Sequence, residues 1–331
     1  MDKKKIKKKI WGVLVGCALG DAMGMPTEMM SRKDISIEFP NGVTGFYTTT
    51  DKDVFGRKMQ AGEITDDTVN TLLLTQMLID SEGRIDTKLY LDYLQNWMKD
   101  NPEKCRYVAG PSTLRALEAI KKGVPLERTG IFGTTNGAAM KISPIGVISD
   151  YHNMSKLVDN VEQICMPTHN TTTAIAGASV VAACVSYGVR GGDNPNDLWD
   201  IAIEAAEFSS DRGYAFPTAS LAKRIKAVRN LVESGDRERI LEELRTFYGT
   251  SVETVESIPA VLAVVQLADG NAWKAACISA SLGGDTDTIG AISGAICGGM
   301  YPSFPQGVIE KLESVNDVYF EGIAEKLSAY V

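Results

Sequence analysis

Residues 281–300 constrain the fold more than any other part of the chain. Two glycines are followed by Asp285, Thr286, Asp287 and Thr288, and then by a long apolar, glycine-rich run. A run of this kind is typical of a helix buried on most sides, and one Asp or Thr is enough to cap its first turn. The remaining carboxylate and hydroxyls therefore need a further explanation.

A second cluster of the same kind consists of Thr65, Asp66, Asp67 and Thr68, again in front of a helical pattern. Adjacent carboxylates repel each other, and neither cluster has a run of basic residues beside it. A hard divalent cation such as Mg²⁺ or Mn²⁺ would relieve this repulsion, because it prefers oxygen ligands. Either cluster alone could be a doubled helix N-cap; two of them in a chain with only two histidines favour a metal site.

Composition narrows the class of protein. The 331 residues carry a net charge of −8, and since the first nine residues contribute +5, the rest carries −13. Such an acidic body argues against stable nucleic-acid binding. The six cysteines are scattered without Cys-x-x-Cys pairs, which indicates reduced thiols and a cytoplasmic protein.

The basic start followed by the apolar residues 10–17 imitates a short export signal. Gly20 and Asp21 interrupt the apolar run directly afterwards, so we expect a buried first helix and no membrane partner. Asp21 itself is expected to be a structural hydrogen-bond acceptor.

The rest of the chain predicts a mostly α-helical single domain over residues 1–331, with no linker and no repeat of fixed period. Residues 35–50 carry the only good β signal, a possible hairpin around Asn41 and Gly42. Residues 131–148 are glycine-rich, and a helix starting near Asn136 would point free N–H groups at an anion. An ordinary glycine turn is the alternative for that segment.

Five motifs, in this order, make the chain resemble the ADP-ribosylglycohydrolase family over nearly its full length. They are Gly20-Asp21-Ala22-Met23-Gly24 with Glu28, Thr65-Asp66-Asp67-Thr68, Asn136-Gly137-Ala138-Ala139-Met140, Thr168-His169 and Gly284-Asp285-Thr286-Asp287-Thr288. The resemblance implies an all-α orthogonal helical bundle with at most a minor β-hairpin, and a centre of two divalent cations, Mg²⁺ or Mn²⁺.

The resemblance also implies roles for individual residues. The metal ligands it implies are Thr65, Asp66, Asp67, Asp285, Asp287 and Thr288. It implies that Glu28 is a further carboxylate near the metals, either ligand or catalytic group, and that the substrate-binding residues are Asn136, Gly137, Ala138, Met140 and His169. Asp66 and Asp67 join Glu28 as catalytic candidates because either could act as the base. From the residues alone, Glu28 could equally be a solvated loop acid and His169 a capping group. Lys141 stands where the family often has Arg, which weakens a bidentate phosphate contact there.

The expected function is a metal-dependent hydrolase that cleaves the ribosyl bond of an ADP-ribosylated protein or small molecule and releases ADP-ribose. Such a reaction passes through an oxocarbenium-like state, which needs negative surroundings and an activated water. We expect a water held by the cations to attack the anomeric carbon, with Glu28, Asp66 or Asp67 as the base.

Three alternatives stay open from the sequence. The substrate could be a small N-riboside or nucleotide, or the protein could bind ADP-ribose without cleaving it. Prenyl-diphosphate synthases also hold magnesium with Asp-rich helices, but residues 66–70 lack the last acid of that motif.

Overall fold

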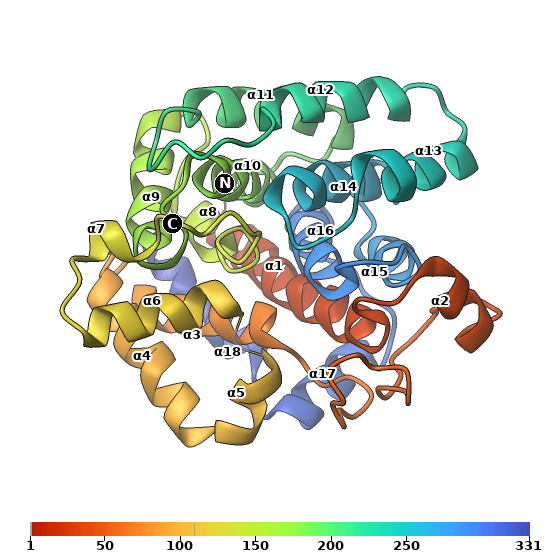
Figure 1. Cartoon of the computed structure of the whole chain (residues 1–331), viewed down its shortest axis with the longest axis horizontal. Coiled ribbons are helices and arrows are strands. Elements are labelled where there is room, and N and C mark those ends of the chain that lie inside the picture. Colours follow the sequence, from red (N-terminus) through yellow and green to blue (C-terminus); the bar gives the residue numbers. More distant parts are fainter. Residues whose placement is uncertain (1, 109) are drawn as a thin grey trace.

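The computed structural model describes residues 2–108 and 110–331 and is all-α (Figure 1). The described residues form no β-strand, only the isolated bridges Thr135–Glu253 and Thr171–Tyr214. The helices are α1 (Lys3–Gly24), α2 (Arg32–Glu38), α3 (Asp66–Asp80), α4 (Thr87–Asp100), α5 (Pro102–Val108), α6 (Pro111–Lys121), α7 (Leu126–Thr129), α8 (Ser143–Ile148), α9 (Met154–His169), α10 (Thr172–Val189), α11 (Leu198–Phe208), α12 (Leu221–Val232), α13 (Arg237–Glu243), α14 (Thr254–Leu267), α15 (Ala272–Ala280), α16 (Thr286–Met300), α17 (Val308–Asn316) and α18 (Phe320–Leu327). A π-helical turn, Leu244–Tyr248, extends α13.

The centre of the fold is the antiparallel pair α1 and α16, which lie side by side through glycines. Glycine recurs every fourth residue on both helices, and residues four apart lie on one helix face. A Cβ atom on Gly16 would overlap the Gly294 carbonyl, and one on Gly20 would overlap the Gly290 carbonyl. The two backbones therefore approach as closely as helices can, which brings the end of α1 to the start of α16.

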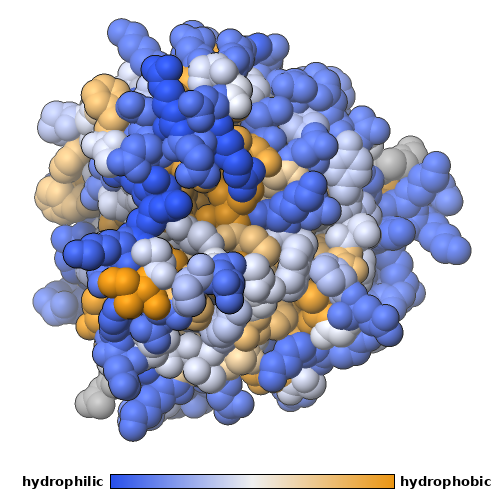
Figure 2. All heavy atoms as spheres, turned by 90° about the vertical axis from the view of Figure 1, so that its right-hand side faces the viewer, coloured by the Kyte–Doolittle hydropathy of each residue, from blue (hydrophilic) through white to orange (hydrophobic). Residues whose placement is uncertain are grey.

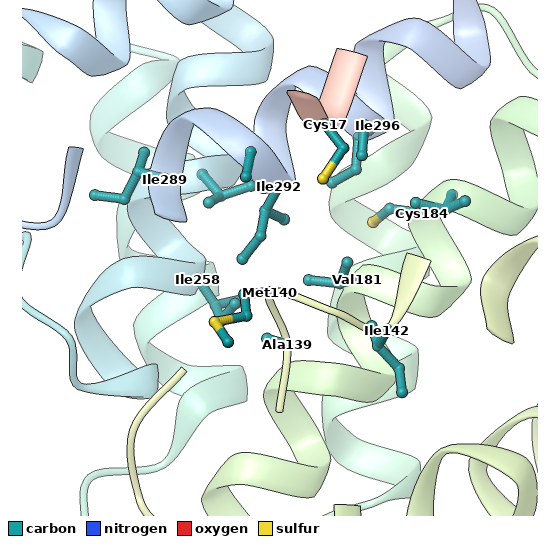
Figure 3. Close-up of a cluster of buried hydrophobic side chains, with 14 of the residues drawn as sticks. Cys17, Ala139, Met140, Ile142, Val181, Cys184, Ile258, Ile289, Ile292 and Ile296 are labelled. Atoms are coloured by element: carbon teal, nitrogen blue, oxygen red, sulfur yellow. The ribbon is translucent and has the colours of Figure 1, made fainter. Parts of the chain in front are cut away.

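The buried face of α16 packs on α10, α14 and the loop before α8 (Figure 3). The close-up shows apolar side chains from all four segments around one centre; it labels Ile289, Ile292 and Ile296 of α16, Val181 and Cys184 of α10, Ile258 of α14, and Ala139, Met140 and Ile142 of the loop. The core thus fixes the start of α16 from several sides.

Two helical stretches, Lys3–Thr27 and Thr172–Val189, are long and apolar enough to cross a membrane, but 94% of the apolar 18-residue segment within each is buried inside the protein. Burial of this extent is what the core helices of a globular protein show. Figure 2 shows the face that carries α2 and α13, where hydrophilic side chains surround smaller apolar patches.

The predicted hairpin at residues 35–50 is wrong. Arg32–Glu38 is helix α2, and the residues that follow form no strand. Ser31 caps α2 by accepting a hydrogen bond from the Asp34 N–H (3.2 Å). The alternation of Ile35 and Ile37 imitated a strand, although the structure buries Ile35 and exposes Ile37 on opposite sides of a short helix.

Candidate metal centre

The first acidic cluster is held against α1 by Asp21. Its carboxylate accepts hydrogen bonds from the backbone N–H groups of Thr65 (3.0 Å) and Thr68 (3.1 Å) and from the Thr68 hydroxyl (2.5 Å). Thr65 caps α3 by accepting from the Asp67 N–H (3.4 Å). Asp21 is therefore a structural acceptor, as expected, and it aligns the first turn of α3 with the end of α1.

The second cluster opens α16 after two glycines with positive φ, Gly283 (91°) and Gly284 (82°). Their backbone conformation lets Gly284 pair with the segment after Glu28: the Met29 N–H donates to the Gly284 carbonyl (2.7 Å), and the Gly284 N–H donates to the Met30 carbonyl (3.2 Å). This pairing places Glu28 beside α16. Glu28, Asp285 and Asp287 each offer a ligand atom within 4.8 Å of the others.

The two clusters meet in space although they are more than two hundred residues apart in the sequence. The Thr288 hydroxyl donates to Asp67 Oδ2 (3.3 Å), as does the Thr65 hydroxyl (3.4 Å). Asp67 Oδ1 is buried and has no hydrogen-bond partner among the described residues. Leaving a carboxylate oxygen in that state is costly unless a further group binds it.

The pKa values of these acids reflect burial and mutual repulsion. Burial, and second the charge of Glu28, raise the pKa of Asp66 to about 8 and that of Asp285 to about 7. The pKa values of Asp67, Asp287 and Glu28 are also raised well above their usual range, first by burial and then by a neighbouring carboxylate. Burial raises the pKa of Asp21 to about 6, against the lowering by its hydrogen bonds from Thr68 and Thr65.

Two basic groups lie against this cluster. Arg57 binds Glu28, with Nη1 2.5 Å from Oε2, and Lys141 is buried close enough to Asp66 for their charges to interact. Burial lowers the pKa of Lys141 to about 8. The positive charges of these two side chains can compensate at most two of the six carboxylates in and around the centre. The six are Asp21, Glu28, Asp66, Asp67, Asp285 and Asp287.

The donor set fits divalent cations. It consists of carboxylates and threonine hydroxyls, the hard oxygen ligands that Mg²⁺ and Mn²⁺ prefer. The unpartnered Asp67 Oδ1 is a ready ligand atom. The residues that could hold cations are Thr65, Asp66 and Asp67 at α3, Asp285, Asp287 and Thr288 at α16, and Glu28 between them.

The segment from Thr135 to Met140 borders this centre. The Asn136 amide donates to Asp285 Oδ2 (2.5 Å), and the His169 ring lies against Gly137, where an added Cβ would come within 2.8 Å of the ring. His169 Nε2 also lies 3.1 Å from the Thr135 hydroxyl. Burial lowers the pKa of His169 well below its usual range, so the ring is neutral.

A helix starting near Asn136 is not what the structure shows. Residues 136–141 form successive turns, and the next helix begins only at Ser143. Asn136, Gly137 and His169 lie together beside Asp285, whereas the side chains of Ala138 and Met140 are buried in the core. A ligand could therefore reach Ala138 only through its backbone.

Sequence reasoning missed Arg57, a single arginine in a loop with no neighbouring motif. It also missed the four-residue glycine spacing shared by α1 and α16, although that signal is plain in the sequence.

The fold and the centre together define a class: an all-α protein in which the ends of three helices bring carboxylates to one point. A profile of the ADP-ribosylglycohydrolase family matches residues 2–331. The chain therefore belongs to the ADP-ribosylglycohydrolase family and is a glycosidic-bond hydrolase of that type.

Two relatives and one solved structure illustrate the match. The uncharacterized protein YegU of Escherichia coli (strain K12) is 33% identical over 330 residues, which cover 98% of this chain and 97% of that protein. The ADP-ribosylarginine hydrolase Tri1 of Serratia proteamaculans (strain 568) is 26% identical, covering 96% and 78% respectively. A solved ADP-ribosylglycohydrolase-related protein complex contains a chain with the same fold, with a TM-score of 0.70 at 23% identity and 98% coverage of each chain.

Proposed function

We propose that this protein hydrolyses the ribosyl bond of ADP-ribosylated substrates and that two divalent cations, Mg²⁺ or Mn²⁺, support the reaction. The observation that carries the proposal is the charge of the centre. Six carboxylates lie in and around the centre, whereas the basic groups against them are Arg57 and Lys141, and Arg57 is shared with Asp53. Divalent cations would compensate the excess negative charge.

The same centre suits the chemistry at an anomeric carbon. Bound cations would hold the ribose hydroxyls and lower the pKa of a water. The surrounding carboxylates provide the negative field that an oxocarbenium-like state needs. One of Glu28, Asp66 and Asp67 takes the proton from the attacking water as the ribosyl C–N or C–O bond breaks, and this proton then passes to the leaving group. The neutral His169 and the Asn136 turn border the substrate.

The substrate class is proposed from kinship. Tri1 carries the description ADP-ribosylarginine hydrolase, and the family profile spans almost the whole chain here. ADP-ribosyl-arginine is thus the first substrate to test. The carrier of the ADP-ribosyl group is a protein or a small molecule. The cytoplasmic location is a separate prediction.

A hydrolysis panel tests the proposal. It contains ADP-ribosyl-arginine, ADP-ribosyl-serine, O-acetyl-ADP-ribose and simple nucleosides, each with Mg²⁺, with Mn²⁺ or with a chelator, and chromatography detects the product. We expect ADP-ribose from at least one ADP-ribosyl compound and none in chelator. Cleavage of nucleosides alone, or full activity in chelator, would refute the proposed substrate class or cation requirement.

Single amide variants identify the base. Glu28→Gln, Asp66→Asn and Asp67→Asn each remove one charge with little change of shape. The variant of the base should keep the cation affinity of the wild type and lose turnover by about 10²-fold or more, whereas the variant of a ligand should bind cations more weakly as well as lose turnover. Asp287→Ala is expected to abolish both cation binding and turnover.

A further inference from the structure

Arg57 lies in the loop between α2 and α3, and its side chain contacts the carboxylate centre. Neither acidic motif in the sequence indicates this contact. The Arg57 side chain is 2% exposed, and Nη1 lies 2.5 Å from Oε2 of Glu28, whose side chain is 14% exposed. A second contact, from Nη2 to the Met25 carbonyl (3.2 Å), ties it to the turn in front of Glu28. Arg57 thus binds both the carboxylate and the backbone that carries it.

The loop around Arg57 is organised to hold this one side chain. Asp53 Oδ2 accepts hydrogen bonds from Arg57 Nε (2.9 Å) and Nη2 (2.7 Å), and Asp53 Oδ1 accepts from the Arg57 N–H (2.9 Å). The Asp53 side chain is also 2% exposed. The Phe55 ring packs under the guanidinium, 4.8 Å from ring centroid to Cζ. A planar guanidinium held at two edges in this way has one orientation.

A fixed guanidinium fixes its partner. Glu28 has three side-chain torsions, and the residue after it, Met29, has a positive φ of 60°, so the chain turns sharply at this point. With Oε2 bound to Arg57, the Glu28 carboxylate stays beside Asp285 and Asp287, where the three offer ligand atoms within 4.8 Å. Without Arg57, that carboxylate could rotate away from the other two.

The charge of Arg57 and its orienting contact with Glu28 have opposite effects on cation affinity. A guanidinium beside a cation site repels the cation, so removing it should strengthen cation binding if Coulomb forces decide. If orientation decides, removing it should weaken binding, because groups that orient metal ligands typically contribute about 10- to 100-fold to metal affinity. The sign of the change therefore separates the two effects.

We propose that Arg57 is a positioning residue that fixes Glu28 as a ligand of a divalent cation, with Asp53 as its anchor. The inference rests on the cation centre of the proposed function, but not on which substrate is cleaved.

A double-mutant cycle on cation binding tests the inference. Calorimetric titration with Mn²⁺ compares the wild type, Arg57→Met, Glu28→Gln and the double variant, after circular dichroism has shown that each is folded. We expect Arg57→Met to weaken binding about tenfold at the site that uses Glu28. In the Glu28→Gln background the same change should alter the affinity less than about twofold, because Arg57 then has no ligand to orient.

Two further variants complete the design. Arg57→Lys keeps the charge but lacks the planar fork, so it should also weaken Mn²⁺ binding; it carries the test if Arg57→Met does not fold. Arg190→Met is the control: Arg190 is a partly buried arginine, 22% exposed, that pairs with Asp150 (3.5 Å) and not with an acid of the centre, so its loss should leave the Mn²⁺ affinity unchanged.

Three results would overturn the inference. The first is tighter or unchanged Mn²⁺ binding in Arg57→Met. The second applies if Arg57→Met is unfolded, and is tighter or unchanged Mn²⁺ binding in Arg57→Lys. The third is a loss of Mn²⁺ affinity that is equal in the presence and absence of the Glu28 carboxylate. If the wild type takes up no cation, the proposed cation centre fails with it. A wild type that binds Mn²⁺ but is insensitive to Arg57 overturns only the role of Arg57.

Discussion

Asp21 shows how one buried carboxylate can organise a site without being a proposed ligand. It collects the Thr65 and Thr68 donors at the first turn of α3, although burial raises its pKa to about 6. Three hydrogen bonds to one carboxylate outweigh the cost of burying it only while all three are made.

We therefore expect Asp21→Ala to lower the free energy of unfolding by about 2–4 kcal/mol, because it leaves buried donors of Thr65 and Thr68 unpaired. Denaturant unfolding measures the loss, and Mn²⁺ titration of the folded protein should show weaker binding. The control is Asp80→Ala at the other end of α3, where an exposed carboxylate accepts from Tyr93 and Gln76 and should contribute less than about 1 kcal/mol. Equal losses in the two variants would contradict the role given to Asp21.

At the scale of single residues, the sequence indicates a ligand more readily than the residue that orients it. Asp66 and Asp285 stand out because four oxygen-bearing residues in succession exceed what a helix cap needs. Arg57 gives no such signal, because its partner Glu28 lies 29 positions away and only the folded loop brings them together. Met140 was expected to contact substrate, yet it is buried, since its position in the turn points it into the core.

The contact between α1 and α16 determines where the centre forms. Gly12, Gly16 and Gly20 face Gly298, Gly294 and Gly290 in turn, so the register of the two helices is fixed by backbone contact. The Thr286 hydroxyl donates to the Gly24 carbonyl (2.9 Å) and closes the same seam at the centre. Any widening of this contact would move Asp21 and Asp287 apart.

Gly16→Ala tests this contact through the sign of its effect. Alanine in a helix is ordinarily favoured over glycine by about 1 kcal/mol. Here the added methyl group would overlap the Gly294 carbonyl, so we expect a loss of about 2 kcal/mol or more and a lower Tm in thermal unfolding. Gly45→Ala is the control for the added methyl group itself, because Gly45 lies in a loop where no heavy atom is within 4 Å of the added Cβ. A Tm that rises in Gly16→Ala would contradict the close approach.

The sequence predicts elements well where an apolar run is long enough to form a helix buried on most sides. The Ala- and Val-rich run of α10 and the apolar run of α16 were both expected as buried helices, and both are helices. Short elements are harder: α2 has seven residues, and its alternating Ile35 and Ile37 fit a strand as well as a helix. Only the Ser31 cap decides between them, and a cap outweighs a two-residue alternation.

Over the whole molecule, the acidic centre links stability to pH. The carboxyl groups of Asp66 and Asp285 have pKa values of about 8 and about 7 in the folded protein, against 3.8 without the fold. Between these limits the cation-free native state binds more protons than the unfolded chain. These two carboxyls therefore contribute most to the free energy of unfolding at low pH, and their contribution falls as the pH rises, by up to about 1.4 kcal/mol per pH unit for each carboxyl. The buried, neutral His169 contributes in the opposite direction below about pH 6.5, and the two carboxyls together outweigh it.

Thermal unfolding at about pH 5.5, 7 and 8 checks this expectation. With a chelator, the Tm should fall from the lowest to the highest pH. With saturating Mn²⁺ the fall should vanish or reverse, since a cation replaces the protons and binds better as the acids ionise. A cation-free protein that is most stable at about pH 8 would show that the acids are already compensated without metal.

The seam between α1 and α16 also sets the order of events during biosynthesis. α1 is synthesised long before α16, and its glycine face has no partner until residues 286–300 have been made. Until α16 has been made, the glycine face of α1 is therefore exposed to chaperones and to other nascent chains. The carboxylate centre forms only when α16 packs against α1, so a chain truncated before α16 lacks Asp287 and Thr288 and leaves the glycine face of α1 without its partner.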